Sequence, residues 1–129
     1  MPTSDFKMTV VAQRITEKGS GYDNFRFVAE GDWIETPFYE FTDKIALSWS
    51  DDFTLYSDSS YIHNGVVSDY TNTIRSTVDP EKGVSYDVNL RLGNNDDSVF
   101  LIAKVYKPNE TGTANVVAEY GHVEIAARD

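Results

Sequence analysis

The chain alternates polar and apolar residues without interruption along Ser85-Tyr86-Asp87-Val88-Asn89-Leu90-Arg91-Leu92. The polar segment Gly93-Asn94-Asn95-Asp96-Asp97 follows, and then comes the apolar run Ser98–Tyr106. Strict alternation predicts a half-exposed β-strand, and a continuous apolar run predicts a strand buried on both faces. We therefore expect residues 85–107 to form a β-hairpin around a polar turn, which makes the fold a β fold.

Period-two segments recur along the rest of the chain, and no segment holds the spacing of an amphipathic helix. Strands are expected at Asp5–Thr16 and Phe25–Glu35, the second with a bend or bulge at Gly31-Asp32. Lys44–Trp49 and Phe53–Tyr56 flank a short Ser/Asp turn and predict a second hairpin.

Two turn signals mark the middle of the chain. Asn64-Gly65 is the dipeptide typical of tight hairpin loops. Asp79-Pro80-Glu81-Lys82-Gly83 combines a proline that presets φ with a glycine that we expect at positive φ. The polar, β-branched segments Val66–Tyr70 and Thr73–Val78 predict edge strands. Ala114–Ala126 predicts the last strand or pair of strands.

These short strands predict an all-β fold. A sheet with one solvent-exposed face must bury its other, apolar face against another layer. The best interpretation is a two-sheet antiparallel β-sandwich, jelly-roll or immunoglobulin-like, and a closed β-barrel is the alternative. The length of 129 residues suits one domain over residues 1–129.

The composition excludes several classes of function. The chain has no cysteine, which excludes disulfides, thiolate metal sites and a cysteine nucleophile. Its net charge of −10 disfavours nucleic acid and anionic membrane surfaces as partners. No segment is long and apolar enough to insert into a membrane, and the start lacks a signal-peptide pattern. A mature exported or cell-surface domain and a cytoplasmic protein both fit, and we expect the exported one.

Catalytic motifs are weak. No Gly-x-Ser-x-Gly elbow is present, and the chain has two histidines. His122 and Glu124 lie two apart on an expected strand, so together with His63 they could form a two-His, one-carboxylate set. A small hydrolase on a β scaffold that uses these three residues is therefore one hypothesis.

Oxygen donors gather at the expected turn after residue 93. Asn94, Asp96 and Asp97 provide amide and carboxylate oxygens, which are the ligands that calcium prefers. Asn and Asp also favour turns for conformational reasons alone. Calcium is the one cofactor that the sequence suggests, with these three residues as candidate ligands.

Aromatic residues in polar surroundings give the strongest functional indication. Trp33 is flanked by acidic residues, and Tyr56 and Tyr61 bracket a Ser/Asp segment that contains Asp58. Flat rings beside carboxylates suit a sugar-binding face, although tyrosines are also ordinary half-buried strand residues. We take Trp33, Tyr56, Asp58 and Tyr61 as candidate ligand-binding residues.

The sequence thus favours a non-catalytic binding or adhesion module whose ligand is a glycan or a protein. The second hypothesis is a structural or inhibitor-like domain that engages a protein partner through an edge strand or loop, with Val66–Val78 as the edge to test. The small hydrolase is the third. The sequence makes no prediction of the oligomeric state.

Overall fold

The computed structural model describes residues 6–33, 42–50, 52–64, 67–89, 97–108 and 113–121. These residues form strands β1 (Phe6–Arg14), β2 (Tyr22–Trp33), β3 (Thr42–Trp49), β4 (Thr54–Asn64), β5 (Val67–Asp69), β6 (Thr73–Asp79), β7 (Gly83–Asn89), β8 (Asp97–Pro108) and β9 (Val116–Gly121). Within the described ranges there is no helix long and apolar enough to cross a membrane.

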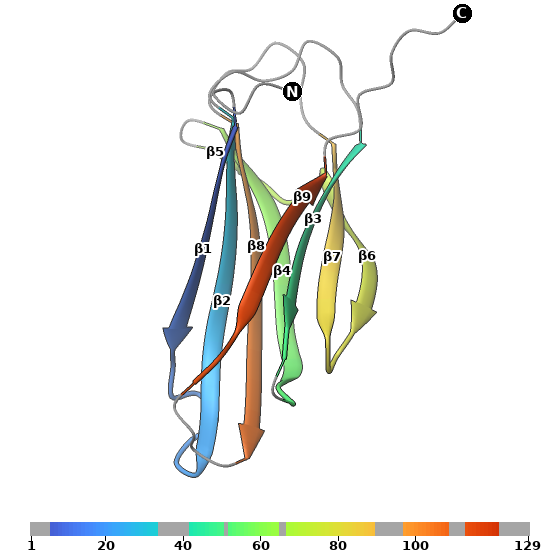
Figure 1. The fold of residues 1–129 in the computed structure, drawn as a ribbon. Helices are drawn as coiled ribbons and strands as arrows, with labels where there is room; N and C mark the ends of the chain where they lie inside the picture. The colour runs from blue at the N-terminus through green and yellow to red at the C-terminus, as the bar shows by residue number, and fades with distance from the viewer. Residues whose placement is uncertain are drawn as a thin grey trace, which may run out of the picture.

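The strands form two antiparallel sheets that lie face to face (Figure 1). Sheet A has the order β1-β2-β8-β4-β5, and sheet B has the order β6-β7-β3-β9. The sheets do not close into a barrel, so the predicted all-β, two-sheet sandwich is confirmed.

The core lies between the two sheets and follows the period of two. In β2 the inward positions are Phe25, Phe27, Ala29 and Trp33, and in β8 they are Val99, Leu101, Ala103 and Val105. Ile45 and Leu47 of sheet B meet them from the other side. Because successive side chains of a strand point to opposite faces, the even-numbered residues of β2 and β8 form the outer face of sheet A.

The predicted hairpin of residues 85–107 is wrong. β7 pairs with β3 and β6 in sheet B, whereas β8 pairs with β2 and β4 in sheet A. The two strands therefore face each other across the core instead of lying side by side. β8 is also not buried on both faces, because its buried residues alternate with partly exposed ones such as Phe100 and Ile102.

The second predicted hairpin is wrong for the same reason. β3 belongs to sheet B and β4 to sheet A, so the chain crosses between the sheets after Trp49. Phe53 is fully buried at this crossing, and its carbonyl oxygen accepts a hydrogen bond of 3.0 Å from Trp49 Nε1. Burial of Phe53 in the core thus fixes the point at which the chain enters sheet A.

Other local predictions hold. β4 and β5 pair as a hairpin on either side of residues 65–66, as Asn64-Gly65 predicted. β6 and β7 form a hairpin across Asp79–Gly83, in which Lys82 N donates to Asp79 O at 2.9 Å. β5 and β6 are edge strands, as expected.

Two glycines behave differently from the prediction. Gly83 is not among the described residues with positive φ; a Cβ there would lie 2.7 Å from Leu47 O, so the close approach of β7 to β3 is what requires glycine. Gly31 lies in an unbroken stretch of β1–β2 pairing, so no bulge is present. A Cβ at Gly31 would meet the Phe6 ring at 2.8 Å.

Candidate functional site

The outer face of sheet A carries an exposed apolar surface. Cross-strand pairing aligns Val11, Val28, Ile102 and Ser59 in one row over β1, β2, β8 and β4. Val11 is 49% exposed, and the other three are partly exposed. The sheet face that points away from the core therefore presents aliphatic side chains to solvent.

An aromatic cluster, formed by Tyr61, Tyr70 and Phe100, lies beside this row. Tyr61 of β4 pairs with Phe100 of β8, and their rings stack at 4.8 Å with an interplanar angle of 14°. Tyr70, which follows β5, lies 5.1 Å from the Tyr61 ring and is 59% exposed. Burial, and then the neighbouring Tyr70, raises the pKa of Tyr61. The cluster offers flat ring surface and phenolic hydroxyls at the same place.

A carboxyl pair borders the aromatic cluster. Glu30 of β2 pairs with Phe100, and Asp32 lies two residues further along the same face. A hydrogen bond with Asp32 raises the pKa of Glu30 to about 6. Asp32 also accepts a hydrogen bond of 2.6 Å from Ser98 Oγ. The apolar surface therefore has a polar margin that can accept hydrogen bonds.

Tyr56, a predicted ligand-binding residue, lies at the other end of the same face. Its hydroxyl donates to Glu17 at 3.0 Å and accepts from Asn24 Nδ2 at 2.9 Å. Lys18 places its ammonium 4.5 Å from the Tyr56 ring centre and 4.4 Å from that of Tyr106. Residues of the β1–β2 connection thus already occupy the Tyr56 ring and hydroxyl.

Trp33 lies in the core. It is 2% exposed, and its Nε1 donates to the Tyr120 hydroxyl at 3.2 Å. The Phe6 ring centre lies 4.7 Å from the Trp33 ring centre. A ring covered in this way has no face available for a sugar, so stacking of Trp33 on a ligand does not fit its position.

Asp58 joins the two sheets. Its carboxylate accepts two hydrogen bonds of 3.0 Å from Arg75 of β6 and one of 2.6 Å from the Tyr86 hydroxyl of β7. The Asp58 side chain is 7% exposed. Burial, and then the Asp58 carboxylate, raises the pKa of Tyr86 to about 12. With these hydrogen bonds Asp58 acts as a cross-sheet connection, a role other than the predicted ligand contact.

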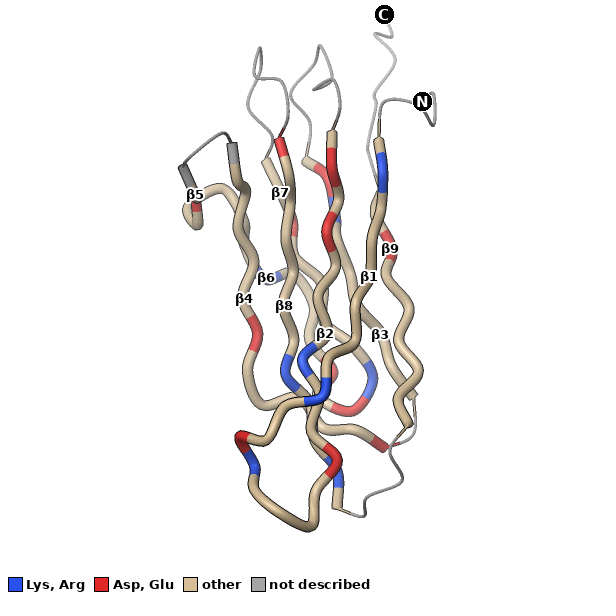
Figure 2. Tube along the Cα trace, turned by 90° about the vertical axis from the view of Figure 1, so that its left-hand side faces the viewer, with Lys and Arg blue, Asp and Glu red and all other residues tan. Residues whose placement is uncertain are grey.

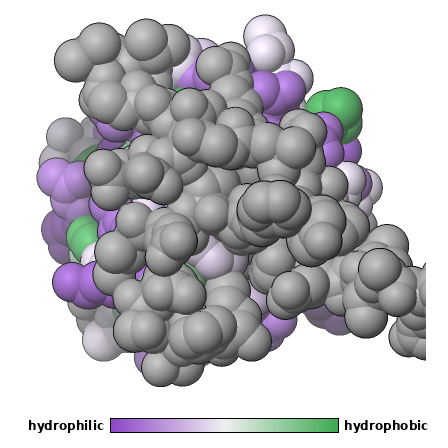
Figure 3. Space-filling model, turned by 90° about the horizontal axis from the view of Figure 1, so that it is seen from above, coloured by the Kyte–Doolittle hydropathy of each residue, from purple (hydrophilic) through white to green (hydrophobic). Residues whose placement is uncertain are grey.

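The predicted calcium ligands are only partly placed. Asn94 and Asp96 lie outside the described residues, whereas Asp97 begins β8 and is fully buried. Seen from the end where β1 and β8 begin, the described side chains around the rim are mostly hydrophilic, with isolated hydrophobic ones (Figure 3). Across the described ranges, no three His, Asp or Glu residues converge on a common point as a metal site would require.

The hydrolase residues are also only partly placed, because His122 and Glu124 lie outside the described residues. His63 Nδ1 lies 3.1 Å from Ser68 Oγ, and these residues pair across the β4–β5 hairpin. A catalytic histidine needs a third group that orients its ring. Among the described side chains, the hydrogen bonds of His63 include no carboxylate, so this contact is a cross-strand polar pair.

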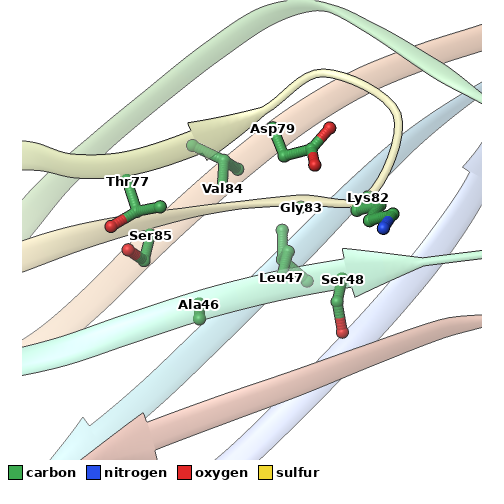
Figure 4. A pocket seen from close by; sticks show the side chains of 9 residues that line it. All are labelled: Ala46, Leu47, Ser48, Thr77, Asp79, Lys82, Gly83, Val84 and Ser85. Atoms are coloured by element: carbon green, nitrogen blue, oxygen red, sulfur yellow. The ribbon is translucent and has the colours of Figure 1, made fainter.

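The outer face of sheet B has a shallow hollow of about 320 Å³. Small side chains form its floor, and those of Asp79 and Lys82 lie at one end (Figure 4). A second hollow of about 200 Å³ lies beside Lys44 and Glu119. No aromatic residue lines the first hollow. Tyr120 lines the second, but its ring packs against Phe6 and Trp33 and its hydroxyl donates to Asp43.

Comparison of the chain with protein-family models, with curated proteins and with solved structures gave no match. The functional argument therefore rests on the residues themselves. Of the predicted residues, Tyr61 and Tyr56 share one exposed sheet face, whereas Trp33 and Asp58 point into the sandwich. Phe100 was missed, although its place between Val99 and Leu101 would have put it on the outer face once β8 was known to be half exposed.

Proposed function

We propose that this domain is a non-catalytic binding module, and that its ligand lies on the outer face of sheet A over the aromatic cluster. The observation that carries the proposal is the aromatic cluster beside the aliphatic row, in which Tyr61 stacks on Phe100 and the exposed Tyr70 packs against Tyr61. Large contiguous apolar surface on a soluble domain marks an interaction site. Ring faces together with phenol hydroxyls and carboxyl acceptors suit a ligand that is itself flat and rich in hydroxyl groups.

A neutral glycan is the ligand class that we favour. Sugar rings present an apolar face to aromatic side chains and hydroxyl groups to acceptors such as Glu30 and Asp32. The net charge of −10 repels acidic polysaccharides, so an uncharged chain is the better partner. A ligand of this kind also agrees with an exported or surface-associated location, which is part of the same proposal.

Affinity electrophoresis in gels that contain neutral soluble polysaccharides tests this function. We expect at least one polysaccharide to retard the protein. Tyr70→Ala should weaken that binding at least tenfold, which corresponds to about 1.4 kcal/mol. Tyr22→Ala is the matched control, because Tyr22 is also an exposed tyrosine of sheet A, 39% exposed and far from the cluster.

Two results would contradict the proposal. One is an unchanged mobility in every neutral polysaccharide. The other is an equal loss of binding in Tyr70→Ala and Tyr22→Ala, because this would place the ligand away from the aromatic cluster. Thermal unfolding of both variants confirms that each is folded before binding is compared.

A further inference from the structure

β1 is an edge strand of sheet A, and among the described residues only β2 pairs with it. It pairs with β2 over nine consecutive residues without a register shift, and it contains no proline or glycine. Just beyond it, Ile15 N donates to Asn24 O at 2.9 Å. Alternation of the antiparallel ladder then directs the N–H and C=O groups of Met8, Val10 and Ala12 away from β2. These groups point to the open edge.

The other three sheet edges in the described ranges are less suitable for pairing. β5 has three residues. β6 has a register shift between Arg75 and Thr77, and such irregularities disrupt the hydrogen-bonding groups of an edge. β9 has six residues and carries Glu119 in a strongly acidic molecule. The sequence pointed to residues 66–78 as the edge to test, but the structure points to β1.

The absence of acidic residues also distinguishes β1 from the other three edge strands, which contain Asp69, Asp79 and Glu119. β1 contains no acidic residue, although the chain has 21. In Figure 2, where the strands of sheet A lie side by side, β1 has a basic segment near each end and an uncharged stretch between them. Val10 is 42% and Val11 is 49% exposed, and their side chains point to opposite faces. The middle of the edge is therefore apolar on both faces.

We propose that β1 pairs antiparallel with β1 of a second copy of this chain, so that the two five-stranded sheets join into one continuous sheet. An antiparallel pair of identical strands is a two-fold, self-complementary interface. With the two-fold axis at Val10, which points its N–H and C=O to the edge, Val10 pairs with Val10 of the second copy and Lys7 pairs with Gln13, so no like charges stand directly opposite. This edge is also where two molecules of net charge −10 meet with the least repulsion.

The proposed strand pairing implies a weak dimer in which both ligand surfaces lie on the same side. One strand pair buries less than the ~1,200 Å² of a stable interface, so the dimer is reversible and depends on concentration. Salt strengthens it by screening the repulsion between the two acidic bodies. A two-fold axis perpendicular to the sheet keeps both outer faces on the same side, which places two copies of the proposed ligand surface side by side and allows bivalent binding.

Sedimentation velocity over a concentration series, at low and high sodium chloride, tests the pairing. We expect a monomer–dimer equilibrium that shifts toward dimer with salt. Val10→Lys should abolish the dimer, because it places a charge at the centre of the interface. Val117→Lys is the matched control: Val117 is a 56% exposed residue of β9, and its substitution changes the net charge equally. This control should dimerise like the unmodified protein.

Val10→Pro gives a second, independent variant. The Val10 N–H points to the open edge, so proline removes a donor to the second copy while the β1–β2 ladder is kept. Circular dichroism establishes that each variant is folded. The proposal is overturned if the unmodified protein stays monomeric in all conditions, if Val10→Lys dimerises like Val117→Lys, or if association continues beyond the dimer.

Discussion

The two sheets are joined by different kinds of contact along the two long sides of the sandwich. On the β1/β9 side, Phe6, Trp33 and Tyr120 form a ring cluster that spans the sheets, with ring centres 4.5–6.1 Å apart. We call it the aromatic wall. On the β4/β6 side, Asp58 binds Arg75 and Tyr86 across the sheets. We call this the polar wall, and hydrogen bonds rather than rings carry it.

The polar wall extends along most of β4. Thr73 Oγ1 donates to Ser60 O at 2.8 Å at one end, and Leu55 N donates to Pro80 O at 2.7 Å at the other. Directional bonds of this kind fix how the sheets align, whereas ring packing contributes mainly burial energy. We therefore infer that the β1/β9 side contributes mainly burial energy, together with the Trp33–Tyr120 hydrogen bond, and that the β4/β6 side contributes mainly the alignment of the sheets.

Replacement of Trp33 by alanine is the largest test of this division. Removing a buried tryptophan costs about 3–5 kcal/mol, a large share of the 5–15 kcal/mol of a typical domain. At about 4 °C per kcal/mol, the melting temperature should fall by more than 10 °C. Tyr70→Ala, an exposed aromatic, is the control and should change stability by less than about 0.5 kcal/mol. A loss below about 1 kcal/mol for Trp33→Ala would show that the aromatic wall contributes little.

Asp58→Ala breaks the polar wall and should have an intermediate effect. It removes three hydrogen bonds and leaves the Tyr86 hydroxyl without its acceptor, which costs about 1–3 kcal/mol. Glu17→Ala is the matched control, because Glu17 also binds a cation and a tyrosine hydroxyl, Lys104 at 2.8 Å and Tyr56 at 3.0 Å, but is 51% exposed. Exposed ion pairs contribute about 0–1 kcal/mol and weaken in salt.

Urea denaturation at low and high salt measures both substitutions. We expect the Asp58 effect to persist in salt and the Glu17 effect to fade. If Asp58→Ala costs no more than Glu17→Ala, the cross-sheet hydrogen bonds of Asp58 contribute no more to stability than an exposed ion pair does.

Local pattern was enough to predict most strands of this fold. Alternation identified β1, β3 and β7, because a strand with one wet face repeats every second residue. Asn64-Gly65 and the Asp79–Gly83 segment identified two hairpins, because turn residues act locally. The polar, β-branched composition of residues 66–78 identified two edge strands for the same reason.

Pairing across the core could not be predicted in the same way. β7 and β8 each carry an apolar stripe, and such a stripe is buried equally well beside a partner or facing it across a sandwich. The residues between them read as a hairpin turn, yet the strands belong to different sheets. Only the whole set of pairs distinguishes the two arrangements.

The prediction of the candidate site residues also lacked the strand pairing. Tyr61 was found because an aromatic residue within a polar segment points to solvent. Trp33 and Asp58 share that local signal, but their partners Tyr120 and Arg75 come from the opposite sheet, 87 and 17 residues away along the chain. A sequence without pairing information cannot separate a surface residue from one that faces the other sheet.

Removal of one tyrosine hydroxyl from each wall, that of Tyr120 or of Tyr86, should have the smallest effect on stability and compares the two walls directly. Each donates a hydrogen bond of 2.6 Å to a carboxylate, Tyr120 to Asp43 and Tyr86 to Asp58. Tyr120→Phe and Tyr86→Phe should each cost about 0.5–1.5 kcal/mol at neutral pH. Tyr120→Phe should cost more, because Asp43 is fully buried and water cannot replace the lost donor.

Alkaline pH separates the two walls further. Burial, and then the nearby carboxylate, raises the pKa of both phenols, that of Tyr86 to about 12. A raised phenol pKa stabilises the fold below the usual value of about 10, and this stability is lost as the pH rises through the folded-state pKa. Urea midpoints should therefore fall with pH above about 10 in the unmodified protein and less steeply in each variant. If Tyr120→Phe keeps the full slope while Tyr86→Phe loses it, water reaches the aromatic wall, and the polar wall is the better sealed of the two.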